Sequence, residues 1–189
     1  MIGADLIARL TASRSERRAQ AGVTLIEVLV GVALLVVLGV LAVPGWQTFQ
    51  ERQRLKSAAE TLATSLNLAR STALAQQQFT YVQLSGQGSE RWCYTVSMTP
   101  NCDCATGCET LQRVDGAQWP GVVLSGSSRK TFRFNWKNGS ATGANGTAMF
   151  VGAQSGQRLC VVLSNLGRVR MVTSKQKPVP GYTPDASCN

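Results

Sequence analysis

Histidine is absent from this chain of 189 residues. Its absence removes the most common general base of enzymes, together with the Ser-His and Cys-His pairs that activate nucleophiles. The sequence also contains no close pair of carboxylates, no phosphate-binding glycine loop and no dinucleotide-binding fingerprint. We therefore expect a protein that is not an enzyme and that requires no cofactor.

Acidic residues are scarce as well, because 10 Asp and Glu stand against 19 Lys and Arg, for a formal net charge of +9. No acid occurs between Asp115 and Asp185, a stretch that contains nine cations. A surface of one sign attracts polyanions and speeds their encounter, whereas a merely solvated surface would tolerate interspersed acids. The segregation favours polyanion binding over that alternative, and the candidate residues are Arg129, Lys130, Arg133, Lys137, Arg158, Arg168, Arg170, Lys175 and Lys177.

One long apolar run, residues 23–43, lies near the N-terminus and contains a single acid, Glu27. As a helix this run would span ~31 Å, which is enough to cross a bilayer. A carboxylate there costs on the order of 2.5–3.5 kcal/mol, so Glu27 requires a function. The preceding residues 1–22 are basic, long and polar. The alternative of an ordinary signal peptide or anchor is disfavoured, because the apolar run is too long and lacks a small-residue cleavage site at its end. We expect them on the cytoplasmic side and the rest of the chain outside the inner membrane.

Residues 44–76 have the pattern of an amphipathic helix that continues the apolar run into a folded domain. Apolar side chains recur at alternating spacings of four and three, which marks one buried face. They are Leu55, Ala59, Leu62, Leu66, Ala69 and Ala73. We expect a single helix over about residues 24–76.

After residue 76 the sequence changes to short β-type runs separated by Gly, Ser and Asn. The predicted strands are residues 80–85, 92–98, 122–124, 131–136, 148–151, 158–164 and 168–173. Phe132, Phe134 and Trp136 share one face of their strand, which we expect to face the core rather than to stack on bases. Residues 138–147, rich in Gly, Asn, Ala and Thr, are expected to form a flexible loop. A long helix packed on antiparallel sheet, with 77–189 as the β-rich domain, is an α+β fold.

Six cysteines lie in the part of the chain that is predicted to be exported, and an even number in an oxidising compartment indicates disulfides. They are Cys93, Cys102, Cys104, Cys108, Cys160 and Cys188. Six cysteines allow 15 pairings, among which we prefer Cys160 with Cys188, since that bond would tie the tail to a strand. The other four would then staple residues 93–108. The cluster lacks the spacing of structural zinc sites and there is no histidine, so disulfides are favoured over metal.

The sequence Gly167-Arg168-Val169-Arg170 follows a predicted hairpin turn at residues 165–167. Gly167 is available there for a left-handed backbone. In a strand that begins at Gly167, Arg168 and Arg170 project to the same side, ~6.6 Å apart, while Val169 points into the core. Two guanidinium groups on one rim suit bidentate contacts with phosphate better than lysines would.

The N-terminal signal, the β-rich domain and the Gly-Arg-x-Arg motif together resemble the GspH/FimT family of minor type IV pilins and pseudopilins. The resemblance implies a type IV pilin-like fold and cleavage after Gly22 by prepilin peptidase. It also implies methylation of the new terminal amine on Val23. Glu27 would pair with the N-terminus of a neighbouring subunit during assembly with other minor and major pilins. The protein would begin as a single-pass inner-membrane protein with a periplasmic domain and end in the extracellular fibre or at its tip.

Within this family, FimT-like members are implicated in binding DNA during natural transformation through arginines of the motif, which correspond here to Arg168 and Arg170. We therefore expect non-specific binding of double-stranded DNA by the basic C-terminal region, Gly167 included. Two alternatives stay open. One is a FimU-like minor pilin that primes pilus assembly without DNA binding, and the other is a GspH-like pseudopilin of type II secretion.

Overall fold

A computed structural model describes residues 23–105 and 107–189. Its elements are α1 (Leu25–Gln76), β1 (Thr80–Ser85), β2 (Cys93–Ser97), β3 (Gln112–Asp115), η1 (Gly116–Gln118), β4 (Val122–Ser127), β5 (Thr131–Phe134), β6 (Gly146–Gly152), β7 (Arg158–Leu163), β8 (Val169–Thr173) and η2 (Ala186–Cys188). The single long helix is as predicted. All seven predicted strands form, with small differences at their ends, and β3 is a strand that the sequence analysis did not predict.

The chain divides into two compact units, residues 1–42 and residues 43–189. In the first unit, Thr24 starts α1 by accepting a hydrogen bond from the Glu27 amide at its side-chain oxygen, at 3.3 Å. The apolar side chains that follow are exposed, among them Leu25 at 80% and Leu35 at 70%. Judged by length and composition, no single helix among the described residues could span a membrane, although Leu25–Val40 and Gly45–Gln76 qualify together as a bent pair.

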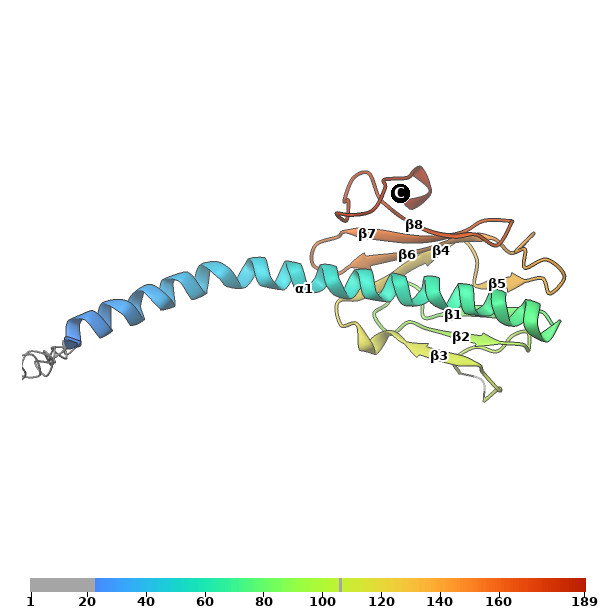
Figure 1. Cartoon of the computed structure of the whole chain (residues 1–189), viewed down its shortest axis with the longest axis horizontal. Coiled ribbons are helices and arrows are strands. Elements are labelled where there is room, and N and C mark those ends of the chain that lie inside the picture. The colour runs from blue at the N-terminus through green and yellow to red at the C-terminus, as the bar shows by residue number, and fades with distance from the viewer. Residues whose placement is uncertain (1–22, 106) are drawn as a thin grey trace, which may run out of the picture. The chain divides into compact units, whose positions relative to one another are not determined.

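The second unit contains two antiparallel sheets (Figure 1). Sheet 1 has the strand order β3-β2-β1-β5, and sheet 2 has the order β4-β6-β7-β8. Successive strands β6, β7 and β8 form a meander in which Leu163 of β7 lies opposite Val169 of β8. The turn between β7 and β8 therefore lies beside the start of β6, where Gly146 pairs with Leu163.

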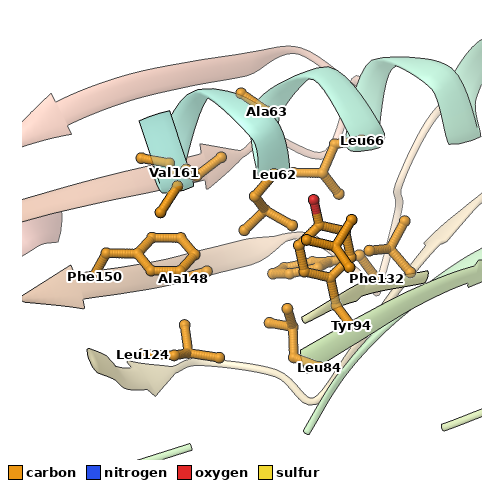
Figure 2. Close-up of a cluster of buried hydrophobic side chains, with 14 of the residues drawn as sticks. Leu62, Ala63, Leu66, Leu84, Tyr94, Leu124, Phe132, Ala148, Phe150 and Val161 are labelled. Carbon is orange, nitrogen blue, oxygen red and sulfur yellow. The ribbon is translucent and has the colours of Figure 1, made fainter. Parts of the chain in front are cut away.

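The core lies between the second half of α1 and the inner faces of both sheets. Figure 2 shows Leu62 and Leu66 of the helix above Phe132 and Phe150, which come from sheet 1 and sheet 2 respectively. All four side chains are buried, as are the other members of the predicted helical stripe. Because every residue of the buried core lies at or beyond Leu55, residues 50–189 contain a complete core.

The C-terminal tail covers the outer face of sheet 2. Cys160 and Val172 point away from the main core and form a small second cluster with Cys188 of η2. A disulfide joins Cys160 to Cys188, which is the pair that the sequence analysis preferred. The other bonds are Cys93–Cys104 and Cys102–Cys108, so all six cysteines are oxidised and residues 93–108 are stapled.

The segment 138–147 does not match its predicted flexibility. Gly139, Ser140, Ala141 and Ala144 are buried, and the Ala141 amide donates to the Asn165 carbonyl at 2.9 Å. The prediction was wrong because it relied on composition: small residues are needed here so that the segment can pack closely against the β7–β8 turn.

Candidate nucleic-acid interface

The cations of the C-terminal half separate into groups when the chain folds. We call the β7–β8 turn, Ser164–Arg168, together with the segments that lie at the same end of sheet 2, the turn end of the hairpin. The opposite extremity, where β7 begins at Arg158 and β8 finishes at Thr173, is the open end. Arg168 belongs to the turn end, whereas Arg158, Lys175 and Lys177 belong to the open end.

The turn end holds the backbone of Arg168 firmly while its side chain is exposed. The Arg168 amide donates to the Ser164 side-chain oxygen at 3.0 Å, and the Ser164 amide donates to the Arg168 carbonyl at 2.9 Å. At the tip, the Leu166 side chain is 79% exposed. Arg168 therefore extends into solvent from a tight, hydrogen-bonded turn.

Two further segments contribute cations at this end of the sheet. The segment after β5 brings Lys137, which is exposed and lies 5.3 Å from the centre of the Trp136 ring. Arg129, in the β4–β5 connection, donates from Nε to the Asn145 carbonyl at 3.0 Å, next to the start of β6. Its neighbour Lys130 is also exposed. The fold thus brings Arg129, Lys130 and Lys137 to the same end of the molecule as Arg168.

Gly167 is not a surface contact, contrary to its predicted place among the DNA-binding residues. It is buried, with φ of +76°, and a Cβ at this position would collide with the Gly139 carbonyl oxygen. Its own carbonyl accepts a hydrogen bond from Nη1 of Arg70 in α1 at 3.2 Å. The glycine of the motif is therefore required by the packing of the turn on residue 139 and on the helix.

Arg170 differs from Arg168 in having an acidic partner. Its Nη2 atom lies 3.4 Å from Oδ2 of Asp185, and the two side chains are 55% and 29% exposed. Asp185 is positioned by the tail, since its side chain also accepts the Ser187 amide at 2.8 Å at the start of η2. Hydrogen bonds from Ser187 hold the pKa of the Asp185 carboxyl below its usual range, and the positive charges of Arg170 and Lys175 lower it further. Asp185 is thus a carboxylate at neutral pH.

The remaining predicted cations lie elsewhere. Arg158 is half-buried at the open end, where its carbonyl accepts from the Thr173 hydroxyl at 2.8 Å. Lys175 and Lys177 are exposed in the segment after β8. Arg133 lies in sheet 1, opposite Tyr81, and its guanidinium stands 5.3 Å from the centre of the Phe79 ring. The ten predicted residues therefore do not form one continuous site.

Sequence reasoning missed Arg70 altogether as a site residue. It lies on α1 beside the buried stripe, between Leu66 and Ala73, and it is half-buried against the hairpin. The sequence feature that could have revealed Arg70 is the Gly- and Asn-rich segment 138–147. Glycines in that segment and in the predicted turn at Gly167 indicate that another side chain packs closely on both. In this protein that group is the Arg70 side chain.

The predicted processing and assembly residues belong to the other unit. Gly22 and the leader lie outside the described residues. Val23 precedes α1, and Glu27 is in its first turn with an exposed side chain. Among the described residues no group of three or more His, Cys, Asp or Glu side chains is placed to hold a metal ion.

Comparison with known proteins identifies two sequence families and one fold. The family model of type II transport protein GspH matches residues 58–167, more than half of the chain, and the prokaryotic N-terminal methylation motif matches residues 17–43. No curated protein sequence matches significantly. A crystal structure of the Pseudomonas aeruginosa PAO1 type IV minor pilin FimU is similar, with a TM-score of 0.54 and 20% identity over 71% of this chain and 98% of that one. A second crystal form of FimU gives a TM-score of 0.47, with 18% identity over 67% and 98%.

Proposed function

Because this chain belongs to the GspH family and carries a prepilin-type methylation motif, which make it a type IV minor pilin or pseudopilin, we propose that it is a minor pilin that binds double-stranded DNA without sequence preference during natural transformation. Minor pilins interact with other pilins during pilus assembly. The DNA site that we propose is the turn end of the β7–β8 hairpin.

The observation that carries this proposal is the exposed Arg168 side chain, which extends from a fixed turn at an end of the sheet that carries further exposed cations. An arginine fork binds phosphate oxygens in a bidentate manner, and neighbouring lysines add point charges along the backbone of the duplex. Such contacts position a protein on DNA but carry little sequence information, so binding should be independent of sequence. The cations at this end are Arg129, Lys130, Lys137 and Arg168.

Membrane insertion, processing and assembly complete the proposal. The exposed apolar side chains of residues 25–40 need a cover, which the inner membrane supplies before assembly and neighbouring subunits supply in the fibre. Prepilin peptidase would cleave after Gly22, the amine of Val23 would be methylated, and Glu27 would pair with the terminal amine of a neighbour. A Gly22→Asp variant should accumulate as uncleaved precursor, and fully mature protein from it would contradict this part.

Titration of double-stranded DNA with residues 50–189 tests the DNA-binding proposal. The expected Kd is on the order of 10⁻⁴–10⁻⁶ M at physiological salt, and the logarithm of affinity should fall linearly with the logarithm of salt concentration, by about 0.9 per phosphate neutralised. Absence of binding even at low salt would favour a FimU-like role in priming assembly. A gene neighbourhood dedicated to type II secretion would favour a pseudopilin instead.

A further inference from the structure

The peptide unit between Gly167 and Arg168 is held at both of its polar atoms. Its carbonyl oxygen accepts a hydrogen bond from Nη1 of Arg70 at 3.2 Å, and its N–H donates to the Ser164 side-chain oxygen at 3.0 Å. A peptide unit is planar and rigid, so fixing both atoms fixes the plane. The direction in which the Arg168 side chain leaves the backbone is thereby determined by a residue of α1 and a residue of the turn.

The Arg70 side chain reaches this carbonyl across two glycines that have left-handed backbones. Gly139 has φ of +65°, and a Cβ on it would lie 2.8 Å from Nε and 3.2 Å from Cγ of Arg70. A Cβ on Gly167 would lie 3.3 Å from the same Nε atom. The absence of side chains at both positions therefore leaves the space that the stem and guanidinium of Arg70 occupy. Three segments distant in the sequence meet at this one side chain.

We propose that Arg70 is a positioning residue for DNA binding, which holds the Gly167–Arg168 peptide so that Arg168 is directed at a phosphate. This inference rests on the proposed DNA binding at the turn end. The hydrogen bond from a charged donor is stronger than one between neutral groups. Fixing a loop in its binding geometry reduces the entropy that is lost when the ligand binds. The hairpin tip has an exposed Leu166. Without Arg70 the turn would keep its own short-range hydrogen bonds and the bond from the Ala141 amide to the Asn165 carbonyl, but the Gly167 carbonyl would lose its bond to the helix.

A double-mutant cycle in residues 50–189 separates positioning from direct contact. Arg70→Met keeps a long apolar stem over the glycines but removes the donor and the charge, and Arg168→Gln removes the phosphate contact. We expect each single variant to lower affinity for a fluorescent DNA duplex, Arg168→Gln by about tenfold, as for loss of a hydrogen bond to a charged group. The double variant should bind within about twofold of Arg168→Gln alone, because a positioning residue has no effect once its target is gone.

Arg54 offers a matched control on the same helix. Its Nη1 atom also donates to a backbone carbonyl outside the helix, that of Pro120 at 3.3 Å, and it lies ~24 Å from Arg70 along α1, toward the start of the helix. Arg54→Met should leave affinity unchanged within about twofold. Arg70→Lys, which keeps the charge and a donor, should restore part of the affinity that Arg70→Met loses. Thermal melts of every variant show that the folded protein is being compared.

A measurement without DNA checks the positioning directly. Arg70→Met should accelerate hydrogen exchange at the Arg168 amide, whereas Arg54→Met should not. If the losses of DNA affinity in Arg70→Met and Arg168→Gln add in the double variant, the inference is overturned, since Arg70 would then contact phosphate by itself. An unchanged affinity in Arg70→Met would overturn it too, and if Arg168→Gln still weakens binding, the proposed function would stand. A parent domain that fails to bind would overturn both.

Discussion

Cations gather at both ends of the β7–β8 hairpin, but the two ends differ in what surrounds them. At the open end the structure also places carboxylates: Glu51 of α1 accepts the Gln154 and Ser155 amides at 2.7 and 2.9 Å, and Asp185 of the tail pairs with Arg170. At the turn end the contacts to Arg70 and Arg129 are made by backbone carbonyls, of Gly167 and Asn145 respectively. A carbonyl fixes a guanidinium without neutralising it, so the turn end keeps its charge for a polyanion.

The largest expected effect is on the stability of the fold, and it comes from breaking the disulfide that ties the C-terminal tail to β7. Replacing Cys160 and Cys188 by serine opens a loop of sequence separation 28. In the chain-entropy description this should lower the free energy of unfolding by roughly 3–4 kcal/mol, which denaturant titration measures. Removing Cys102–Cys108, with a separation of 6, should cost about 2 kcal/mol in the same description. If the two variants lost the same free energy of unfolding, the tail would be held mainly by contacts other than its disulfide.

Arg168→Gln is expected to have the next largest effect, and it acts at the turn end alone. Affinity for DNA should fall about tenfold and the salt slope should become shallower by about 0.9, because one charge-assisted phosphate contact is lost. The fold should be unaffected, since the side chain is exposed. Arg168→Lys should recover only part of the loss, because a point charge replaces a bidentate fork. An unchanged slope in Arg168→Gln would place the DNA site elsewhere.

Asp185→Asn should have a smaller effect and of the opposite sign. The Arg170–Asp185 pair lies at the surface, where solvent screens it, so removing the carboxylate frees Arg170 for phosphate at little cost in stability. DNA affinity should rise by up to about fivefold. The rise should be absent when Arg170 is also changed to Gln, and a rise that persists there would mean that Asp185 acts by general charge repulsion.

Lys175→Gln and Lys177→Gln should have the smallest effects. Both residues are exposed in the segment after β8, at the end of the hairpin opposite Arg168. We expect affinity changes within about twofold for each, measured by the same titration. Losses as large as that of Arg168→Gln would remove the distinction between the two ends.

The sequence predicted those features that depend on periodicity and composition. The stripe from Leu55 to Ala73, the β strands and the Cys160–Cys188 bond follow from local pattern and compartment, and the structure has all of them. The strand β3 was not predicted because Gln112–Asp115 is short and half-polar. It forms because β2 supplies a partner strand.

The candidate site could be predicted only in part, since it depends on contacts between distant segments. Arg168 and Arg170 look equivalent in sequence, and only the folded tail distinguishes them by bringing Asp185 to Arg170. Likewise the sequence predicts a left-handed conformation for Gly167. It does not show why glycine is required there, because Gly139 and Arg70, which pack against it, are distant in the sequence.

Chemical-shift mapping of residues 50–189 with a short DNA duplex tests the central claim most directly, because it locates the contact without any substitution. We predict that the largest amide shifts on addition of DNA centre on Arg168 and Gly139 and fade toward the open end. Shifts centred on Lys175 and Lys177, or on the outer strand β3 of sheet 1, would contradict the assignment of the DNA-binding surface to the turn end.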